Sequence, residues 1–388
     1  MSGAAHVSER FRALDGWRGV CALLVAAHHL ESYGFLYWQP LIRQAWLFVD
    51  FFFVLSGFVI AHSYGARLST GAGVRDFAWR RFARLWPLHI GCLLALIGLE
   101  LARLVLLARF PSPGAHAAFT EGRSVWAIVT NLFLVQGMGL HDHLTWNGPS
   151  WSISTEFWTY LIFAAVCLSA SGQRLRRILS VLLLLGAVAV LAHWSPQGMR
   201  ETSGFGFFRC LYGFFAGVLT YELWRSRRLA AVSGTWLEAA VILGIVAFLT
   251  FAAGKATLEY LATPLFALAV LIFASERGAL SALLTTRPFA ALGRWSYSIY
   301  MVHTVVLATL FSAVHSAEVV FHASWLRHDP DGNANFAFGW GNDVLMFVFP
   351  ALTVAVAALT WRVIERPGQR LFGPGPRRQA IEPAPQSM

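Results

Sequence analysis

An arginine and two histidines interrupt the first strongly apolar stretch of the chain, "LDGWRGVCALLVAAHHL" at residues 14–30. Eleven residues of an α-helix turn through about 1100°, so Arg18 and His29 share one face within about 20° and lie about 16 Å apart along the axis. His28 is turned about 80° away from Arg18. An ionisable group inside a membrane helix is a functional candidate by default. The alternative is that Arg18 extends to the lipid headgroups while His29 bonds a neighbouring helix.

Three further ionisable residues lie in apolar stretches. They are Asp50 in "LFVDFFFVLSGFVI", Glu156 in "NGPSWSISTEFWTYLIF" and His303 in "GRWSYSIYMVHTVVL". Each of them alone is also compatible with a hydrogen-bonded structural role. Burying all three together with His29 is costly unless the groups find partners or water. The four residues therefore predict a shared, hydrated pocket inside a helical bundle.

A basic cluster precedes the third apolar stretch, in "RRFARLWPLH" at residues 80–89. Arg81 and Arg84 are three positions apart, which places them on the same face of a helix. Pro87 is best tolerated near the start of a helix, so we expect a helix N-terminus beside these guanidinium groups. Such a place suits phosphate, which predicts a cytoplasmic anionic donor such as a nucleotide or coenzyme A. The alternative is ordinary anchoring by cytoplasmic arginines.

The composition requires an integral membrane protein. Of the 388 residues, 57% are hydrophobic and 13% are charged, whereas soluble domains contain about 45–50% apolar and about 25% charged residues. The net charge of +10 reflects arginines of cytoplasmic loops rather than nucleic-acid binding. The four cysteines all lie in apolar runs, so we expect neither disulfides nor a metal site from them.

The arginine clusters determine how the apolar runs are counted as spans. The run at 124–139 is short for a span, which needs about 20 residues. If it re-enters the membrane or lies at the interface, the later basic clusters fall on the cytoplasmic side. We therefore predict an all-α polytopic protein with about ten transmembrane helices, one short re-entrant or interfacial helix and both termini cytoplasmic. The loop 315–341 and the segment around 109–150 are then extracytoplasmic.

The predicted organisation has one domain. Residues 1–13 form a cytoplasmic N-terminal segment, residues 14–371 form the transmembrane domain, and residues 372–388 form a Pro/Gly-rich cytoplasmic tail that we expect to be disordered. The expected location is the plasma (inner) membrane.

Six stretches in register resemble the membrane acyltransferase family 3. They run in order from residue 14 to about 371, and they include its Arg-x10-His, Arg-x-x-Arg and Trp-Ser-x-Ser-x-Glu motifs. The stretches are "LDGWRGVCALLVAAHHL", "FVDFFFVLSGFVI", "RRFARLWPLH", "GPSWSISTEFWTYLIF", "GRWSYSIYMVH" and "VIERPGQRL". The resemblance implies transfer of an acyl group, usually acetyl, from cytoplasmic acyl-CoA to a hydroxyl of a glycan or of another extracytoplasmic or lipid-linked acceptor.

The resemblance also implies roles for single residues. His29 matches the catalytic histidine, Arg18 its paired arginine, and Glu156 the acidic residue of the tryptophan motif. The donor-side residues are Arg81 and Arg84, with Arg80 beside them. The residues expected to bind or support the substrate are Asp50, Trp151, Ser152, Tyr297 and His303. Many members carry an SGNH-type hydrolase-like domain that this chain does not show, so a second transfer step would need a separate extracytoplasmic partner.

These residue types fit acyl transfer. A histidine with a pKa near neutrality is the usual base for an attacking hydroxyl, and an arginine or another polar group can stabilise the oxyanion. We expect His29 to deprotonate the acceptor, Arg81 and Arg84 to hold coenzyme A phosphates, and Glu156 or Asp50 to orient His29 or to bind acceptor hydroxyls. A covalent acyl-histidine intermediate is the variant route. No metal is expected.

A secondary transporter or flippase is the alternative function, because buried ionisable residues also serve as coupling groups. Such transporters often contain two matched halves with interrupted helices, and the sequence shows no matched halves. Lipids surround the protein in either case.

Overall fold

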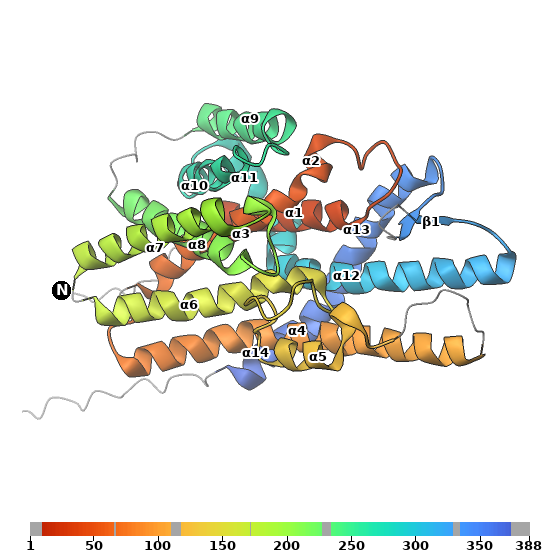
Figure 1. The fold of residues 1–388 in the computed structure, drawn as a ribbon. Helices are drawn as coiled ribbons and strands as arrows, with labels where there is room; N and C mark the ends of the chain where they lie inside the picture. Colours follow the sequence, from red (N-terminus) through yellow and green to blue (C-terminus); the bar gives the residue numbers. More distant parts are fainter. Residues whose placement is uncertain are drawn as a thin grey trace, which may run out of the picture.

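The computed structural model describes residues 10–65, 67–109, 118–170, 172–226, 234–328 and 334–373. Most of these residues are helical, and the long helices lie side by side in one bundle (Figure 1). The helices are α1 (Arg12–His29), α2 (Pro40–Arg43), α3 (Phe48–Tyr64), α4 (Gly71–Arg109), α5 (Val125–Leu132), α6 (Trp151–Ser169), α7 (Gln173–Trp194), α8 (Gly206–Arg225), α9 (Thr235–Phe251), α10 (Ala262–Phe273), α11 (Ala279–Leu284), α12 (Arg287–Phe321), α13 (Gly341–Thr360) and α14 (Arg366–Phe372).

Shorter elements connect the helices. A π-helical turn, Trp361–Glu365, joins α13 to α14. Strands β1 (Leu326–His328) and β2 (Ala334–Phe336) pair antiparallel after α12. Among the described residues, single 3₁₀ turns occur at Ala45–Leu47, Glu121–Arg123, Gly148–Ser150, Gly198–Arg200 and Glu259–Leu261.

The helices identify a multi-pass membrane protein. In the described part of the chain, six helical stretches are long and apolar enough to cross a bilayer, and they contain α3, α4, α6, α7, α12 and α13. The apolar helices α9 and α10 are shorter, while α1 and α8 carry several polar residues. The count of ten spans and the cytoplasmic placement of both termini stay predictions.

The short run at 124–139 does not form a membrane-spanning helix. Its helix, α5, has eight residues and is therefore about 12 Å long. The hydroxyl of Ser124 accepts a hydrogen bond from the amide of Ala127 at its start. The imidazole of His89 bonds the carbonyl of Asn131 near its end at 3.0 Å. Figure 1 shows α5 beside α4, where this bond attaches it.

Two boundaries differ from the sequence-based expectation. Helix α12 continues to Phe321, so the first part of the predicted loop 315–341 is helical. Helix α4 begins at Gly71, and Pro87 lies inside it. The expected helix N-terminus beside the arginines was therefore wrong. Of the predicted disordered tail, residues 374–388 lie outside the described residues, as do residues 1–9 of the N-terminal segment.

Glycines allow α1 and α12 to cross closely. A Cβ atom at Gly19 would lie 2.6 Å from the backbone carbon of Leu292, and one at Gly293 would overlap the carbonyl of Asp15. Small residues at helix crossings let backbones approach in this way in membrane proteins. The crossing brings Arg18 and His29, both on α1, against the polar side of α12.

Candidate active site

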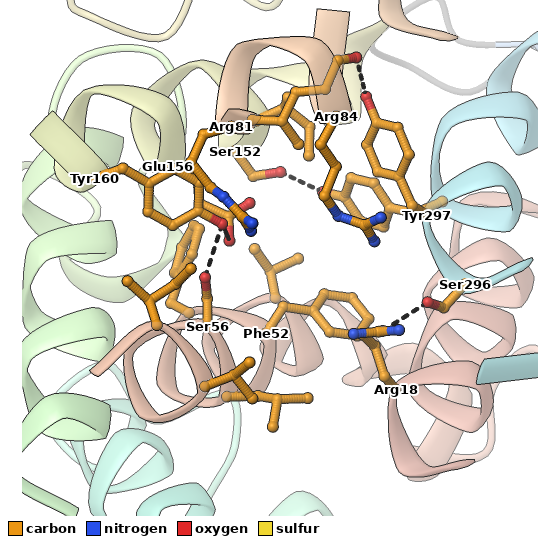
Figure 2. A pocket seen from close by; sticks show the side chains of 18 residues that line it. Arg18, Phe52, Ser56, Arg81, Arg84, Ser152, Glu156, Tyr160, Ser296 and Tyr297 are labelled. Carbon is orange, nitrogen blue, oxygen red and sulfur yellow. Dashed lines mark hydrogen bonds between the residues drawn. The ribbon is translucent and has the colours of Figure 1, made fainter. Parts of the chain in front are cut away.

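A cavity of about 140 Å³ collects most of the charged residues that the sequence singled out. Figure 2 shows the side chains of Arg18, Arg81, Arg84 and Glu156 around this space, which we call the arginine cavity. Its walls come from α1, α3, α4, α6 and α12. Three guanidinium groups and one carboxylate line it, so its walls carry a net positive charge.

Arg81 and Arg84 reach the cavity from one face of α4. Arg81 donates to the Tyr64 hydroxyl at 3.0 Å, while its buried Nε has no hydrogen-bond partner among the described residues. Arg84 lies 3.8 Å from the carboxylate of Glu365, and its side chain is 35% exposed. A buried free donor and a half-exposed guanidinium are suited to hold an anion at the opening of the cavity. Arg80 does not line the cavity, because it pairs with Asp76 at 3.0 Å.

Glu365, the last residue of the π-helical turn, lies beside Arg84. Glu365 is 2% exposed and accepts hydrogen bonds from Ser298 at 2.6 Å and from Gln369 at 3.1 Å. The following helix α14 packs on α4 at Pro87, where a Cβ on Gly368 would overlap the proline ring. This close contact holds the carboxylate beside the arginine.

Arg18 is fixed by the crossing of α1 and α12. Its Nε donates to the Ser296 hydroxyl at 2.7 Å and one of its terminal nitrogens donates to the Gly293 carbonyl at 3.0 Å. The same nitrogen lies 3.2 Å from Asp15. Arg18 therefore lines the cavity, and contacts within the bundle hold its guanidinium there.

Glu156 faces the same cavity from α6. It accepts a hydrogen bond from the Tyr160 hydroxyl at 2.6 Å, and that hydroxyl lies 2.9 Å from the Ser56 hydroxyl (Figure 2). No described arginine lies within 4.0 Å of its carboxylate oxygens. The carboxylate is thus oriented by a tyrosine rather than neutralised by an ion pair.

A second cavity of about 580 Å³, the histidine cavity, contains His29. Its polar lining residues are His28, His29, Tyr37, Arg43, Gln44, Arg200, Thr202, Arg209 and Tyr300. Val49 and Tyr300 line both cavities. The two spaces therefore adjoin at these side chains, with Arg18 in one and His29 in the other.

One hydrogen bond fixes the tautomer of His29. Its Nδ1 lies 2.8 Å from the carbonyl of Val25. Because a carbonyl only accepts, Nδ1 carries the proton when the ring is neutral, and Nε2 keeps a free lone pair. This is the form that a general base requires.

His28 and His303 flank His29. The Nδ1 of His28 lies 3.2 Å from the Ile42 carbonyl, and His28 lines the same cavity as His29, which the helical-face argument did not predict. The ring of His303 lies 4.8 Å from that of His29 between centroids. His303 is fully buried, and neither of its nitrogens has a hydrogen-bond partner among the described residues.

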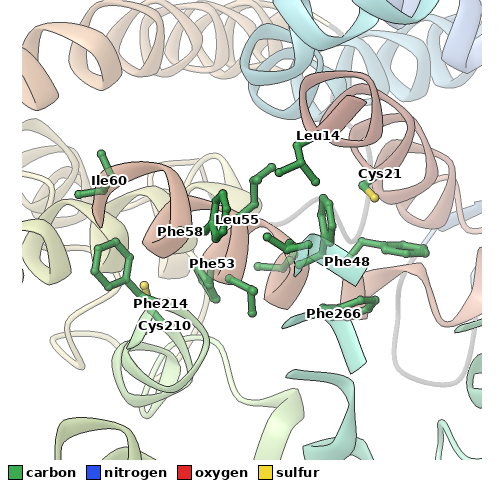
Figure 3. Close-up of a cluster of buried hydrophobic side chains, with 14 of the residues drawn as sticks. Leu14, Cys21, Phe48, Phe53, Leu55, Phe58, Ile60, Cys210, Phe214 and Phe266 are labelled. Carbon is green, nitrogen blue, oxygen red and sulfur yellow. The ribbon is translucent and has the colours of Figure 1, made fainter. Parts of the chain in front are cut away.

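Asp50 lines neither cavity. Its carboxylate accepts two hydrogen bonds from Arg209, at 2.9 and 2.7 Å, and both side chains are almost completely buried. Helix α3 carries Asp50 on a core of phenylalanines that includes Phe53, Phe58 and Phe214 (Figure 3). Asp50 therefore holds Arg209 in the histidine cavity and does not contact His29.

Two neighbouring residues in the first turn of α6 line different cavities. Trp151 lines the histidine cavity, and Ser152 lines the arginine cavity. The Ser152 and Tyr300 hydroxyls lie 2.8 Å apart, and both donate to the Pro149 carbonyl. Tyr297 donates to the Leu85 carbonyl at 2.5 Å. These bonds fasten α6 and α4 to α12 at the boundary between the cavities.

The chain matches the model of a protein family described as an acyltransferase domain over residues 11–362. The chain belongs to this acyltransferase family. It is 25% identical to Acyltransferase MdmB of Streptomyces mycarofaciens, across 97% of this chain and 95% of that protein. It is 24% identical to the putative peptidoglycan O-acetyltransferase YrhL of Bacillus subtilis, across 76% of this chain and 49% of that protein. No solved structure matches.

A third relative covers a smaller part of this acyltransferase. Protein 2 in picA locus of Rhizobium radiobacter is 35% identical over 160 residues, which are 40% of this chain and 82% of that protein. The resemblance read from the six sequence motifs is confirmed by the family match.

Sequence reasoning missed several residues that line or border the two cavities. Arg209, Arg200 and Arg43 line the histidine cavity, but in the sequence they stand near helix ends, where arginines are common. Glu365 stood in a quoted motif without an assigned role. Tyr300 stood in another, and its spacing of three from His303 on one helix was the available signal.

Proposed function

We propose that the protein is a membrane O-acyltransferase that takes an acyl group, by default acetyl, from acyl-CoA. The observation that carries this proposal is the pair of adjoining cavities, one lined by guanidinium groups and the other by a histidine with a free Nε2. Family membership supports the reaction class. The identity of the acyl donor, the role of His29 as the base and the class of acceptor are what we propose in addition.

The donor enters the arginine cavity. Arg81 and Arg84 bind coenzyme A phosphates at its opening, where the Nε of Arg81 is free and Arg84 is half exposed. The thioester then extends inward to Val49 and Tyr300, which border both cavities. Arg81 and Arg84 belong to the basic segment that the predicted topology places on the cytoplasmic side, so we place this opening toward the cytosol.

The chemistry takes place where the cavities adjoin. Nε2 of His29 removes the proton from the acceptor hydroxyl, and the oxygen attacks the thioester carbonyl carbon. Arg18 or Arg84 stabilises the negative charge on the carbonyl oxygen. The C–S bond then breaks, and the coenzyme A thiolate takes the proton back from His29. In the variant route, His29 itself carries the acyl group between two such steps.

The acceptor enters the histidine cavity from the opposite side. Relatives named as peptidoglycan O-acetyltransferases support a hydroxyl of a glycan, either extracytoplasmic or lipid-linked. A multi-pass protein of a cytoplasmic (inner) membrane would meet acyl-CoA on one side and such an acceptor on the other. A separate extracytoplasmic protein could carry the acyl group further.

The test is transfer of label from [¹⁴C]acetyl-CoA in inside-out membrane vesicles that contain the full chain. We expect label in a base-labile ester in vesicles with the wild-type chain, and at least about 10²-fold slower labelling with His29→Ala at equal protein level. Equal labelling by the two chains would contradict the assignment of His29. A secondary transporter would label nothing and would not bind coenzyme A.

A further inference from the structure

The histidine cavity is lined by positive charge at its mouth. Arg43 and Arg200 are exposed, Arg209 lies deeper, and no aspartate or glutamate lines this cavity among the described residues. Three guanidinium groups around one space are more than the proposed chemistry at His29 uses. We therefore ask which ligand of the cavity these positive charges would bind.

Tryptophan rings hold each of these guanidinium groups. Arg43 stacks on Trp38 at 4.1 Å between the guanidinium carbon and the ring centroid. Arg200 and Arg209 lie over Trp46 at 5.4 and 5.1 Å. Stacking on a tryptophan orients a guanidinium while leaving its N–H edge free to donate. The arginines are therefore held in place before a ligand arrives.

Carboxylates neutralise only two of the three arginines. Arg209 pairs with Asp50, and Arg200 pairs with the fully buried Glu259 at 3.0 Å. Arg43 has no described carboxylate within 4.0 Å. Planar, charged donors without a protein partner suit a carboxylate or a phosphate.

Tyr37 adds a neutral donor beside Arg43. Burial, with the nearby charge of Glu31, raises the pKa of Tyr37 to about 12. The phenol therefore stays protonated at physiological pH and can donate a hydrogen bond to an anion in the cavity.

We propose that the acceptor carries a carboxylate or a phosphate, which Arg43 binds together with Tyr37 at the mouth of the histidine cavity. Arg200 contributes its remaining N–H groups. This inference rests on the proposed acyltransferase function and narrows its substrate class to anionic acceptors. The anionic group fixes the acceptor at the mouth and leaves a neighbouring hydroxyl to reach Nε2 of His29.

The first test examines the charge of the labelled product. The full chain in detergent, where both cavities are accessible, is incubated with [¹⁴C]acetyl-CoA and a membrane extract that contains the acceptor. Unreacted acetyl-CoA is removed, and the labelled product is applied to an anion-exchange column at pH 7. We expect the column to retain the label. If phosphatase or mild acid treatment abolishes retention, the group is a phosphate; if carbodiimide-mediated reduction abolishes it, the group is a carboxylate. Label that passes through unretained would overturn the inference while leaving the proposed function intact.

The second test uses a matched pair of arginine variants. Arg43→Gln removes the unpaired charge, whereas Arg177→Gln removes an exposed arginine that lines neither cavity. Loss of one charge-assisted contact should raise the KM for the acceptor extract about tenfold or more, with the KM for acetyl-CoA unchanged. Arg177→Gln should behave as wild type.

The outcomes distinguish failure of the anionic-acceptor inference from failure of the proposed acyltransferase function. An unchanged acceptor KM in Arg43→Gln would mean that Arg43 only anchors the protein at the membrane interface, which overturns the inference. A wild-type chain that neither binds acetyl-CoA nor transfers label would overturn the proposed function itself, and this inference with it.

Discussion

At the scale of single residues, His28 and His29 differ in their neighbours although they share one cavity. The ring of His29 lies beside the fully buried His303, whereas Nδ1 of His28 is directed to a carbonyl of α2. Only His29 lies on the face of α1 that also carries Arg18.

We therefore predict unequal losses when the two histidines are replaced. His29→Ala should lower the rate of acyl transfer by about 10²–10⁴-fold, the usual contribution of a general base. His28→Ala should lower it by less than about tenfold, because a ring that only lines the cavity contributes positioning. Initial rates in vesicles, normalised to protein level, measure both. Equal losses would argue against His29 as the base.

The buried pair of Asp50 and Arg209 leads to a prediction about stability. Asp50→Asn leaves a buried guanidinium without its counter-charge, which should cost about 3–5 kcal/mol and lower the thermal midpoint in detergent. The double variant Asp50→Asn/Arg209→Gln removes both charges and should recover part of that loss. A single variant as stable as wild type would contradict this role of Asp50.

The sequence predicted which residues lie together only where those residues are close in the chain. Arg18 and His29 lie on one helix, so helical geometry alone placed them on a common face. Asp50 and Arg209 are 159 residues apart, and no local pattern links an aspartate on one helix to an arginine on another. Asp50 was therefore expected near the base, whereas it holds an arginine.

At the scale of elements, the crossing of α1 and α12 aligns the two cavities. Arg18 bonds α12 near one end of the crossing, and His29 meets His303 near the other. The sequence shows the glycines of α1 and α12. It does not show that these two helices cross, because hydrophobic periodicity does not specify which helices pack together.

A bulky residue at this crossing should impair activity more than one elsewhere. Gly19→Leu would force α1 away from Leu292 and displace Arg18 from Ser296. Gly98→Leu on α4 is the control, since nothing lies within 4 Å of a Cβ at that position. We expect the first variant to lose most transfer activity and thermal stability, and the second to retain both. If both variants behave alike, the crossing does not position the site.

At the scale of the whole molecule, the charge distribution predicted the topology, but hydropathy supports only part of it. Six stretches qualify as spans by length and hydropathy among the described residues. Helix α1 is not among them, and it carries Asp15 and two arginines as well as His28 and His29. Hydropathy therefore misses the helix that carries the proposed catalytic residues.

Labelling of single cysteines tests the topology. Ten spans with a cytoplasmic N-terminus predict that Thr70→Cys and Gln173→Cys react with an impermeant maleimide only from the cytoplasmic side. Gln197→Cys and Ser324→Cys should react only from outside. The four native cysteines are buried and free, so they should give little background. Labelling of Thr70→Cys and Gln197→Cys from the same side would rule out the predicted orientation.

Donor binding and catalysis are assigned to different cavities, so the most direct test measures the two separately. Isothermal titration of acetyl-CoA into the purified full chain would be compared with transfer rates for wild type, Arg81→Gln/Arg84→Gln and His29→Ala. We predict that the double arginine variant binds acetyl-CoA at least about tenfold more weakly. We predict that His29→Ala binds it like wild type but transfers the acyl group at least about 10²-fold more slowly. Unchanged binding by the arginine variant, or lost binding by His29→Ala, would contradict the account.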